Sequence, residues 1–298
     1  MTSSSTGSST STVKANGIEI AYETFGDRGG RPLLLVMGLA TQMLAWHEDF
    51  CGALVDRGFY VVRFDNRDIG LSTHVTDAPP PDVMAAFGGD FSSASYRLED
   101  MADDTAGLLD ALEIPAAHVV GASMGGMIAQ TLAIRHPSRV LSLTSIMSTT
   151  SPAVGAATAE ASAVLLAPPA TSREEAVART LTTYGVIGSP GYPLDEAWLR
   201  QIAAEAYDRA YDPVGVARQL LAIAASGDRT AALADVRVPT LVVHGEDDPL
   251  VQVAGGRATA AAVPGAELLV IPGMGHNLPR ELWPQIVDAI EEVAARAE

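Results

Sequence analysis

A serine stands in the middle of the stretch GASMGG, residues 121–126, where a short apolar run gives way to a helical pattern. Glycines two positions before and two positions after a serine are typical of a sharp strand-to-helix turn that projects the hydroxyl out of the fold. A serine hydroxyl is a weak nucleophile near neutral pH and needs a base within hydrogen-bond distance. Ser123 is therefore a candidate nucleophile, and the alternative is a tight turn without a chemical role.

The chain has six histidines that could supply this base. Five of them fall in predicted helices or strands, at their ends, or in a turn-rich segment: His47, His74, His118, His136 and His244. The sixth, His276, lies in the loop PGMGHNLP directly after the last apolar run. A carboxylate that orients this histidine could come from Glu246, Asp247 or Asp248 in HGEDDPL. Serine, acid and histidine in this chain order predict acyl transfer.

The predicted elements would bring these residues together. Strands are predicted at 17–26, 32–38, 59–65, 117–121, 140–148, 239–245 and 266–273, and helices at 42–58, 97–113, 124–136, 250–263 and 279–297. This alternation predicts an α/β fold with a mostly parallel, doubly wound sheet and helices on both faces. Ligands bind at the carboxyl ends of such strands, where the serine, the acids and the histidine are expected.

The chain is predicted to have a core, an insertion and a tail. Residues 13–148 and 233–298 carry the strand–helix alternation and are expected to form the core. The block 149–232 is rich in Ala, Thr and Pro and has helical pieces without a good strand, which predicts a helical cap or lid. Residues 1–12, MTSSSTGSSTST, are expected to form a disordered N-terminal tail.

Charge and composition exclude several classes of partner. The chain has 36 acidic and 19 basic residues and a formal net charge of −17, so nucleic acid and membrane surfaces are not expected partners. The Ser/Thr-rich start lacks the apolar core and positive charge of a secretory signal, and no apolar run is long enough to predict a membrane-spanning helix. The single cysteine, Cys51, excludes an intrachain disulfide, fits a cytoplasmic location and is expected to pack inside a helix.

Several spaced motifs give the chain a resemblance to the α/β-hydrolase family. They are VMGLA (36–40), VRFDNRDIGLST (62–73), GASMGG (121–126) and the pair HGEDDPL and PGMGH, and the match covers nearly the whole chain after residue 14. The resemblance implies the α/β-hydrolase fold with a helical cap insertion and a triad of Ser123, Asp248 and His276. The family pattern H-G-x-x-D selects Asp248, with Asp247 as the runner-up. Asp65, Arg67 and Asp68 are expected to form structural ion pairs.

The same resemblance implies an oxyanion hole made of the backbone N–H groups of Leu39 and Met124. Met37 stands where the family usually has histidine, but backbone donors do not depend on that side chain. Gly38 and Trp46 are candidates for the substrate pocket. Aromatic residues of the insertion are further candidates, each of which could instead pack the insertion's own core: Tyr184, Tyr192, Trp198, Tyr207 and Tyr211.

The implied activity is a serine hydrolase that cleaves carboxylic esters through an acyl-enzyme. Within the family, the motifs are similar to those of actinobacterial carboxylesterases and polyketide methylesterases. The expected substrate is an uncharged small molecule, with no cofactor and no metal; the spacing of His244 and Glu246 could suit a metal, but the family places both at a strand end. Homo-oligomerisation is left open.

The triad residues leave other activities open. A polyketide methylesterase, a lactonase, a C–C bond hydrolase and a cofactor-free perhydrolase or haloperoxidase would all use the same Ser–His–Asp set. A catalytically inactive ligand-binding protein on the same fold is the alternative outside enzymes.

Overall fold

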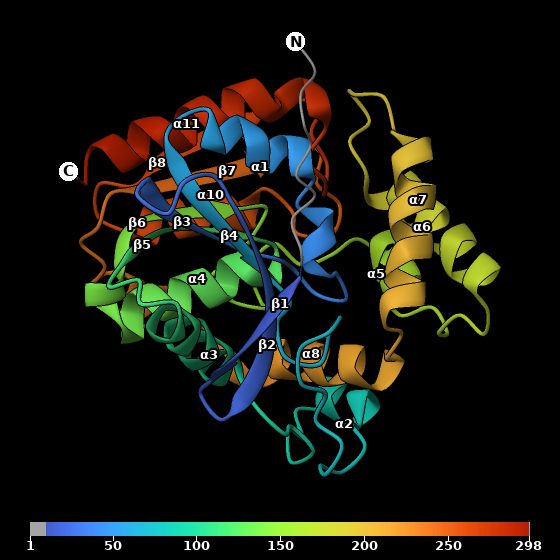
Figure 1. The fold of residues 1–298 in the computed structure, drawn as a ribbon. Coiled ribbons are helices and arrows are strands. Elements are labelled where there is room, and N and C mark those ends of the chain that lie inside the picture. Colours follow the sequence, from blue (N-terminus) through green and yellow to red (C-terminus); the bar gives the residue numbers. More distant parts are fainter. Residues whose placement is uncertain (1–9, 298) are drawn as a thin grey trace.

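An eight-stranded sheet forms the centre of the protein in the computed structural model, which describes residues 10–297 (Figure 1). The strands are β1 (Ser11–Ala15), β2 (Ile18–Phe25), β3 (Arg31–Val36), β4 (Phe59–Phe64), β5 (Ala117–Ala122), β6 (Val140–Ile146), β7 (Thr240–Gly245) and β8 (Glu267–Ile271). Their spatial order is β1-β2-β4-β3-β5-β6-β7-β8. β2 pairs antiparallel with both β1 and β4, and the remaining neighbours are parallel. The predicted α/β class with a mostly parallel, doubly wound sheet is confirmed.

The central strands are buried and mostly apolar because helices cover both sides of the sheet. Every residue of β5 and of β7 is buried. The polar member of β5, His118, is accommodated by a 2.9 Å hydrogen bond between its Nδ1 and the Ser142 hydroxyl on β6. The carboxyl ends of both strands therefore lie inside the fold.

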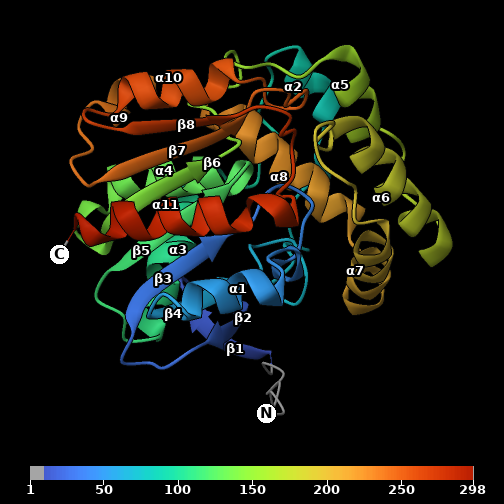
Figure 2. The same ribbon diagram turned by 90° about the horizontal axis from the view of Figure 1, so that it is seen from above.

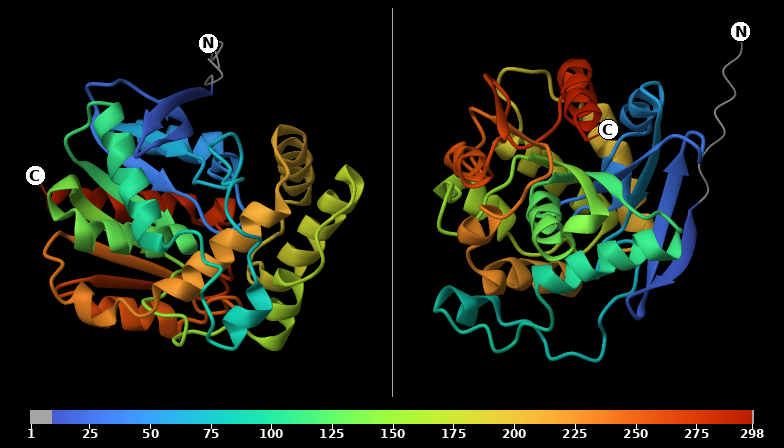
Figure 3. Two further views of the ribbon diagram at one scale, coloured as in Figure 1. Left: turned by 90° about the horizontal axis from the view of Figure 1, so that it is seen from below. Right: turned by 90° about the vertical axis from the view of Figure 1, so that its left-hand side faces the viewer.

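Two pairs of helices cover the faces of this sheet. α1 (Glu48–Val55) and α11 (Trp283–Ala295) lie over one face, and in Figure 2 they are in front of the sheet. α3 (Leu98–Ala111) and α4 (Met124–Arg135) lie over the other face, seen in the left panel of Figure 3. Their apolar side chains make one hydrophobic core on each side of the sheet. α10 (Ala254–Ala262) packs against β7 and β8.

The connection from β6 to β7 contains helices and, among the residues described, no strand. The helices are α5 (Ala159–Leu165), α6 (Arg173–Ile187), α7 (Glu196–Arg209), α8 (Pro213–Ser226) and the short α9 (Thr230–Leu233). A side-chain oxygen accepts a backbone N–H at the start of α5, α6, α7 and α8, which satisfies part of each exposed helix end. α5, α6 and α7 stand beside the sheet, on the right in Figure 1.

The structure corrects the sequence analysis near the N-terminus. Ser11 and Thr12 pair with Tyr22 and Ala21 as part of β1, so the prediction of disorder is wrong for these two residues. Cross-strand pairing orders them, although their local composition is that of a flexible segment. The first nine residues of the predicted tail lie outside the described part of the chain.

Helix boundaries also differ in places. The predicted helix 42–58 is divided into a 3-10 turn, η1 (Met43–Ala45), and α1, because His47 caps α1 by accepting the Asp49 N–H at its Nδ1. The predicted final helix is likewise divided into η3 (Arg280–Leu282) and α11. The short α2 (Val83–Phe87) was not predicted. Between residues 10 and 297, every helix falls short of the length or apolarity needed to cross a membrane.

Cys51 provides a direct test of the core beneath α1. The side chain is fully buried, and burial raises the pKa of its thiol to about 12. Because the thiolate is the reactive form, we expect the native protein not to react with dithionitrobenzoate at pH 8. After unfolding in guanidinium, the exposed Cys51 should release one equivalent of thionitrobenzoate. Rapid reaction of the native protein would contradict this packing.

Candidate active site

Ser123 occupies a strained turn between β5 and α4. Its backbone has φ +56° and ψ −121°, a combination that L-residues rarely adopt. The turn is held from both sides, since the Ser123 N–H donates to the Ile146 carbonyl at 2.9 Å and the Ser148 hydroxyl donates to the Ser123 carbonyl at 2.8 Å. Strain of this kind persists only where the surrounding structure over-determines it.

Glycine is needed on both sides of Ser123, because neighbouring backbone occupies the space that a side chain at Gly121 or Gly125 would take. A Cβ on Gly121 would lie 2.1 Å from the Gly125 carbonyl oxygen, and a Cβ on Gly125 would lie 2.0 Å from the Val36 carbonyl oxygen. Any side chain at these positions would force α4 away from β3 and β5. The G-x-S-x-G spacing is thus a packing requirement at this place.

Ser123, His276 and Asp248 form a hydrogen-bonded chain. Ser123 Oγ lies 2.9 Å from His276 Nε2, and His276 Nδ1 lies 2.7 Å from Asp248 Oδ2. An ionised carboxylate can only accept, so Nδ1 carries the proton and Nε2 is left to accept the serine hydroxyl. The imidazole is thereby held in the tautomer that can take a proton from Ser123.

Of the acids in HGEDDPL, Asp248 is the one bonded to His276. Its side chain is completely buried, and its second oxygen accepts the N–H groups of Leu250 and Val251, each at 2.9 Å. Asp247 and Glu246 are exposed, and Asp247 accepts the Gly273 N–H at 2.8 Å instead. The turn after β7 therefore directs a single carboxylate inward.

His244 supports this turn from β7. Its Nε2 donates to the Val251 carbonyl at 2.7 Å, which fixes the residue whose N–H bonds Asp248. Burial lowers the pKa of His244, so the ring is held neutral. His244 is fully buried and Glu246 is exposed, so the two side chains lie in different surroundings.

The loop that carries His276 is bonded to the connection after α6. The His276 N–H donates to the Ile187 carbonyl at 2.7 Å. The Ser189 hydroxyl accepts the Gly275 N–H at 2.9 Å and donates to Asn277 Oδ1 at 2.6 Å. The helical segment thus holds the residues on both sides of the histidine. The sequence gives no indication of this role for Ser189, since a serine in a surface turn carries no motif.

The loop after β3 lies against the serine. Gly38 is buried, and a Cβ placed on it would come within 3.0 Å of Ser123 Cβ. Within residues 10–297, the backbone N–H groups of Leu39 and Met124 have no hydrogen-bond acceptor. Met124 is the first residue of α4, where an unpaired N–H and the helix dipole both favour negative charge. Both predicted oxyanion donors therefore flank the serine.

Trp46 and the aromatic candidates of the helical segment are dispersed. Trp46 is buried in the core beneath α1, where it stacks on Phe50 at 5.6 Å between ring centroids. Trp198 contacts the His47 ring, Tyr192 donates to the Pro272 carbonyl at 3.3 Å, and Tyr207 packs against Tyr211. Tyr184 lies on α6. These contacts favour packing roles for Trp198, Tyr192 and the Tyr207–Tyr211 pair.

Residues 31–279 match the family model described as alpha/beta hydrolase fold. The chain belongs to this family. It is 29% identical over 290 residues to two curated relatives, each aligned over 90% of this chain and 92% of the relative: the rhodomycin D methylesterases DauP from Streptomyces sp. (strain C5) and DnrP from Streptomyces peucetius. The family and these relatives identify the protein as a hydrolase.

A solved structure supports the fold assignment. The enol-lactonase from Burkholderia xenovorans LB400 superposes with a TM-score of 0.72 and 23% sequence identity, over 96% of this chain and 100% of the enzyme. At that identity the likeness concerns the fold alone, and it extends through the helices between β6 and β7.

The DNRDIGLST turn of the hydrolase forms the predicted ion pairs. Asp65 lies 2.6 Å from Arg209, Arg67 lies 2.6 Å from Asp104, and Asp68 lies 3.7 Å from Arg218. Arg209 belongs to α7 and Arg218 to α8, so these ion pairs also connect the helical segment to the core.

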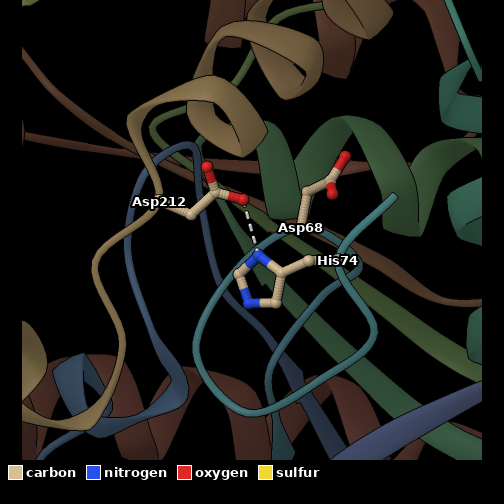
Figure 4. A group of neighbouring side chains, drawn as sticks. All are labelled: Asp68, His74 and Asp212. Carbon is tan, nitrogen blue, oxygen red and sulfur yellow. Dashed lines mark hydrogen bonds and ion pairs between the residues drawn. The ribbon is translucent and has the colours of Figure 1, made fainter. Parts of the chain in front are cut away.

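Asp68, His74 and Asp212 form a cluster near this turn whose ligand atoms all lie within 4.8 Å of one another (Figure 4). His74 Nδ1 lies 2.7 Å from Asp212 Oδ2, and its Nε2 lies 3.0 Å from the Gly70 carbonyl. Both partners are acceptors, so both ring nitrogens donate and the imidazole is charged. A ring in this state has no lone pair for a metal, and the cluster is an ion pair that joins the turn to the start of α8.

The His74–Asp212 pair predicts a pH-dependent contribution to stability. Burial disfavours the charged imidazole, but the hydrogen bonds to Gly70 and Asp212 outweigh it and raise the pKa of His74. A raised folded-state pKa stabilises the protein below the unfolded-state value and loses that effect as the pH rises through the folded-state value. We expect His74→Gln to lower the free energy of unfolding by about 1 kcal/mol at pH 5.5, and by less at pH 9.

Urea unfolding of both proteins at the two pH values measures this difference. Asp212→Asn, which removes the partner and leaves the ring, should show the same trend. A deficit of the same size at both pH values would contradict the charged pair.

Proposed function

We propose that the protein is a serine esterase that hydrolyses carboxylic esters through an acyl-enzyme intermediate. The observation that carries the proposal is the hydrogen-bonded chain from Ser123 through His276 to the buried Asp248. The nucleophile, the base and the orienting acid each come from a loop at the carboxyl end of a parallel strand, which is where this fold binds ligands.

The reaction begins when Ser123 Oγ attacks the ester carbonyl carbon while His276 Nε2 takes the hydroxyl proton. Asp248 stabilises the resulting imidazolium through Nδ1. The tetrahedral intermediate collapses as His276 gives the proton to the leaving alcohol. A water molecule, deprotonated by His276, then attacks the acyl carbon, and the carboxylic acid leaves as Ser123 regains its proton.

The N–H groups of Leu39 and Met124 would stabilise the oxyanion of both tetrahedral intermediates. Two observations support this role: neither group has a hydrogen-bond acceptor in the described chain, and Gly38 packs directly against Ser123. Donors that are already oriented need no reorganisation as charge develops, which is the source of their catalytic effect.

For the substrate we propose an uncharged methyl ester of a polycyclic polyketide. The support is the 29% identity to two rhodomycin D methylesterases along nine-tenths of the chain. We further propose that the helices between β6 and β7 act as a cap over the ester, because the connection after α6 is bonded to the His276 loop and α8 to the loop after β3.

Hydrolysis of p-nitrophenyl esters from acetate to dodecanoate, together with a polyketide methyl ester, tests the proposed function. We expect turnover by the wild type and a fall in kcat of about 10⁶-fold, to background, in Ser123→Ala. The small change at Ser123 leaves a folded protein, which circular dichroism checks. Equal turnover by the wild type and Ser123→Ala, or no turnover of any ester, would overturn the proposal.

The neighbouring acids give a matched pair of variants that tests the triad. Asp248→Asn should lower kcat about 10⁴-fold, because a side-chain amide can donate to Nδ1 and stabilise the wrong imidazole tautomer. Asp247→Asn, one residue away and exposed, should change kcat by less than about threefold, which is a barrier change under about 0.7 kcal/mol. Steady-state kinetics of both variants on the preferred ester distinguish the two acids, and an equal loss would refute the assignment of Asp248.

A further inference from the structure

The Leu39 N–H belongs to the peptide between Gly38 and Leu39, and the peptides before and after it are both held by side chains. Before it, Asn66 Nδ2 donates to the Met37 carbonyl at 2.9 Å. After it, the Ala40 N–H donates to Gln219 Oε1 at 3.1 Å. The peptide that carries the proposed oxyanion donor thus lies between two peptides that side-chain hydrogen bonds hold in place.

The side chain of Gln219 is itself fixed in position. It is completely buried, and both ends of its amide are used, since Nε2 donates to the Arg67 carbonyl at 2.8 Å. That second bond decides the direction of the amide and turns Oε1 toward Ala40. The helix that carries Gln219, α8, is itself attached to the core by the Arg218–Asp68 and His74–Asp212 contacts.

The backbone of Ala40 is independent evidence that contacts with other residues constrain this loop. Its φ is +61°, in the left-handed region that costs a residue with a Cβ on the order of 1–3 kcal/mol. A loop with such a residue would relax into another conformation unless its surroundings prevented it. The hydrogen bond from the Ala40 N–H to Gln219 acts at the strained residue itself.

We propose that Gln219 is a positioning residue of the oxyanion hole: it holds the Leu39–Ala40 peptide so that the Leu39 N–H points at the oxyanion formed on the Ser123 adduct. The inference rests on the proposed esterase function and extends it to a residue of the helical segment, 179 positions from Ala40 in the chain. The hydrogen bonds of Gln219 go to Ala40 and to the Arg67 carbonyl and not to Ser123, His276 or Asp248, so its proposed action is through the loop.

Gln219→Met tests this role, since methionine fills a similar volume without an acceptor. We expect kcat to fall about 10- to 100-fold and KM to change less than about threefold, because a misdirected oxyanion donor weakens the transition state selectively. The inhibition constant of phenylboronic acid, which forms a tetrahedral adduct on serine, should rise by a comparable factor. Gln219→Glu keeps an acceptor for the Ala40 N–H but loses the donor to the Arg67 carbonyl, so it should recover part of the lost kcat.

Gln130→Met is the matched control. Gln130 is also a completely buried glutamine, and its amide bonds Ser145 Oγ at 3.1 Å and Arg229 Nε at 3.4 Å, not the loop after β3. A similar loss of stability without the selective loss of kcat is expected there. An equal effect on kcat in both methionine variants would show that Gln219 matters only for stability, and would overturn the inference.

The two proposals fail separately. If Ser123→Ala matches the wild type, the esterase function is wrong. If Ser123→Ala is inactive and folded Gln219→Met keeps the wild-type kcat and boronate affinity, only the positioning role is wrong. Should Gln219→Met not fold, Gln219→Asn retains a buried amide but is too short to reach Ala40. A folded Asn variant with wild-type kcat would overturn the inference equally.

Discussion

The site depends on the direct contact between the first turn of α4 and the ends of β3 and β5. Gly121 and Gly125 lie so close to neighbouring backbone that no side chain fits at either position. This contact bends the chain at Ser123 into a strained conformation and leaves the N–H at the start of α4 beside the hydroxyl. It also brings the loop after β3 against the same serine. The positions of the proposed nucleophile and of both predicted oxyanion donors thus follow from one packing arrangement.

The helical segment between β6 and β7 also holds parts of the site in place. Its α6 end is hydrogen-bonded to the loop that carries His276, and its α8 holds the Ala40 peptide. Buried ion pairs such as Asp65–Arg209 join it to the core, and removing one partner of such a pair leaves an uncompensated charge. We therefore expect that the core alone, without these helices, would have neither His276 nor the loop after β3 correctly placed.

Local patterns predicted most of the fold. Apolar runs identified β3 to β8, and the runs are strongest in central strands such as β5 and β7, whose residues are all buried because helices cover both faces. They failed at Ser11 and Thr12, two polar residues at the start of an edge strand that pairs with β2. They also failed at residues 42–58, where a histidine cap divides the helix. In both places a contact with other residues outweighs the composition of the segment itself.

The sequence by itself determined the fold class, the candidate nucleophile and the candidate base, because glycine spacing and strand ends leave few places for a reactive serine and histidine. It narrowed the acid to three neighbours, with Asp248 preferred by resemblance to a family. Only the tertiary structure decided which carboxylate contacts His276, since adjacent residues in a turn point in different directions. It alone placed Gln219 and Ser189, because a buried amide or hydroxyl that holds a distant backbone has no local signal: its partner lies far away in the chain.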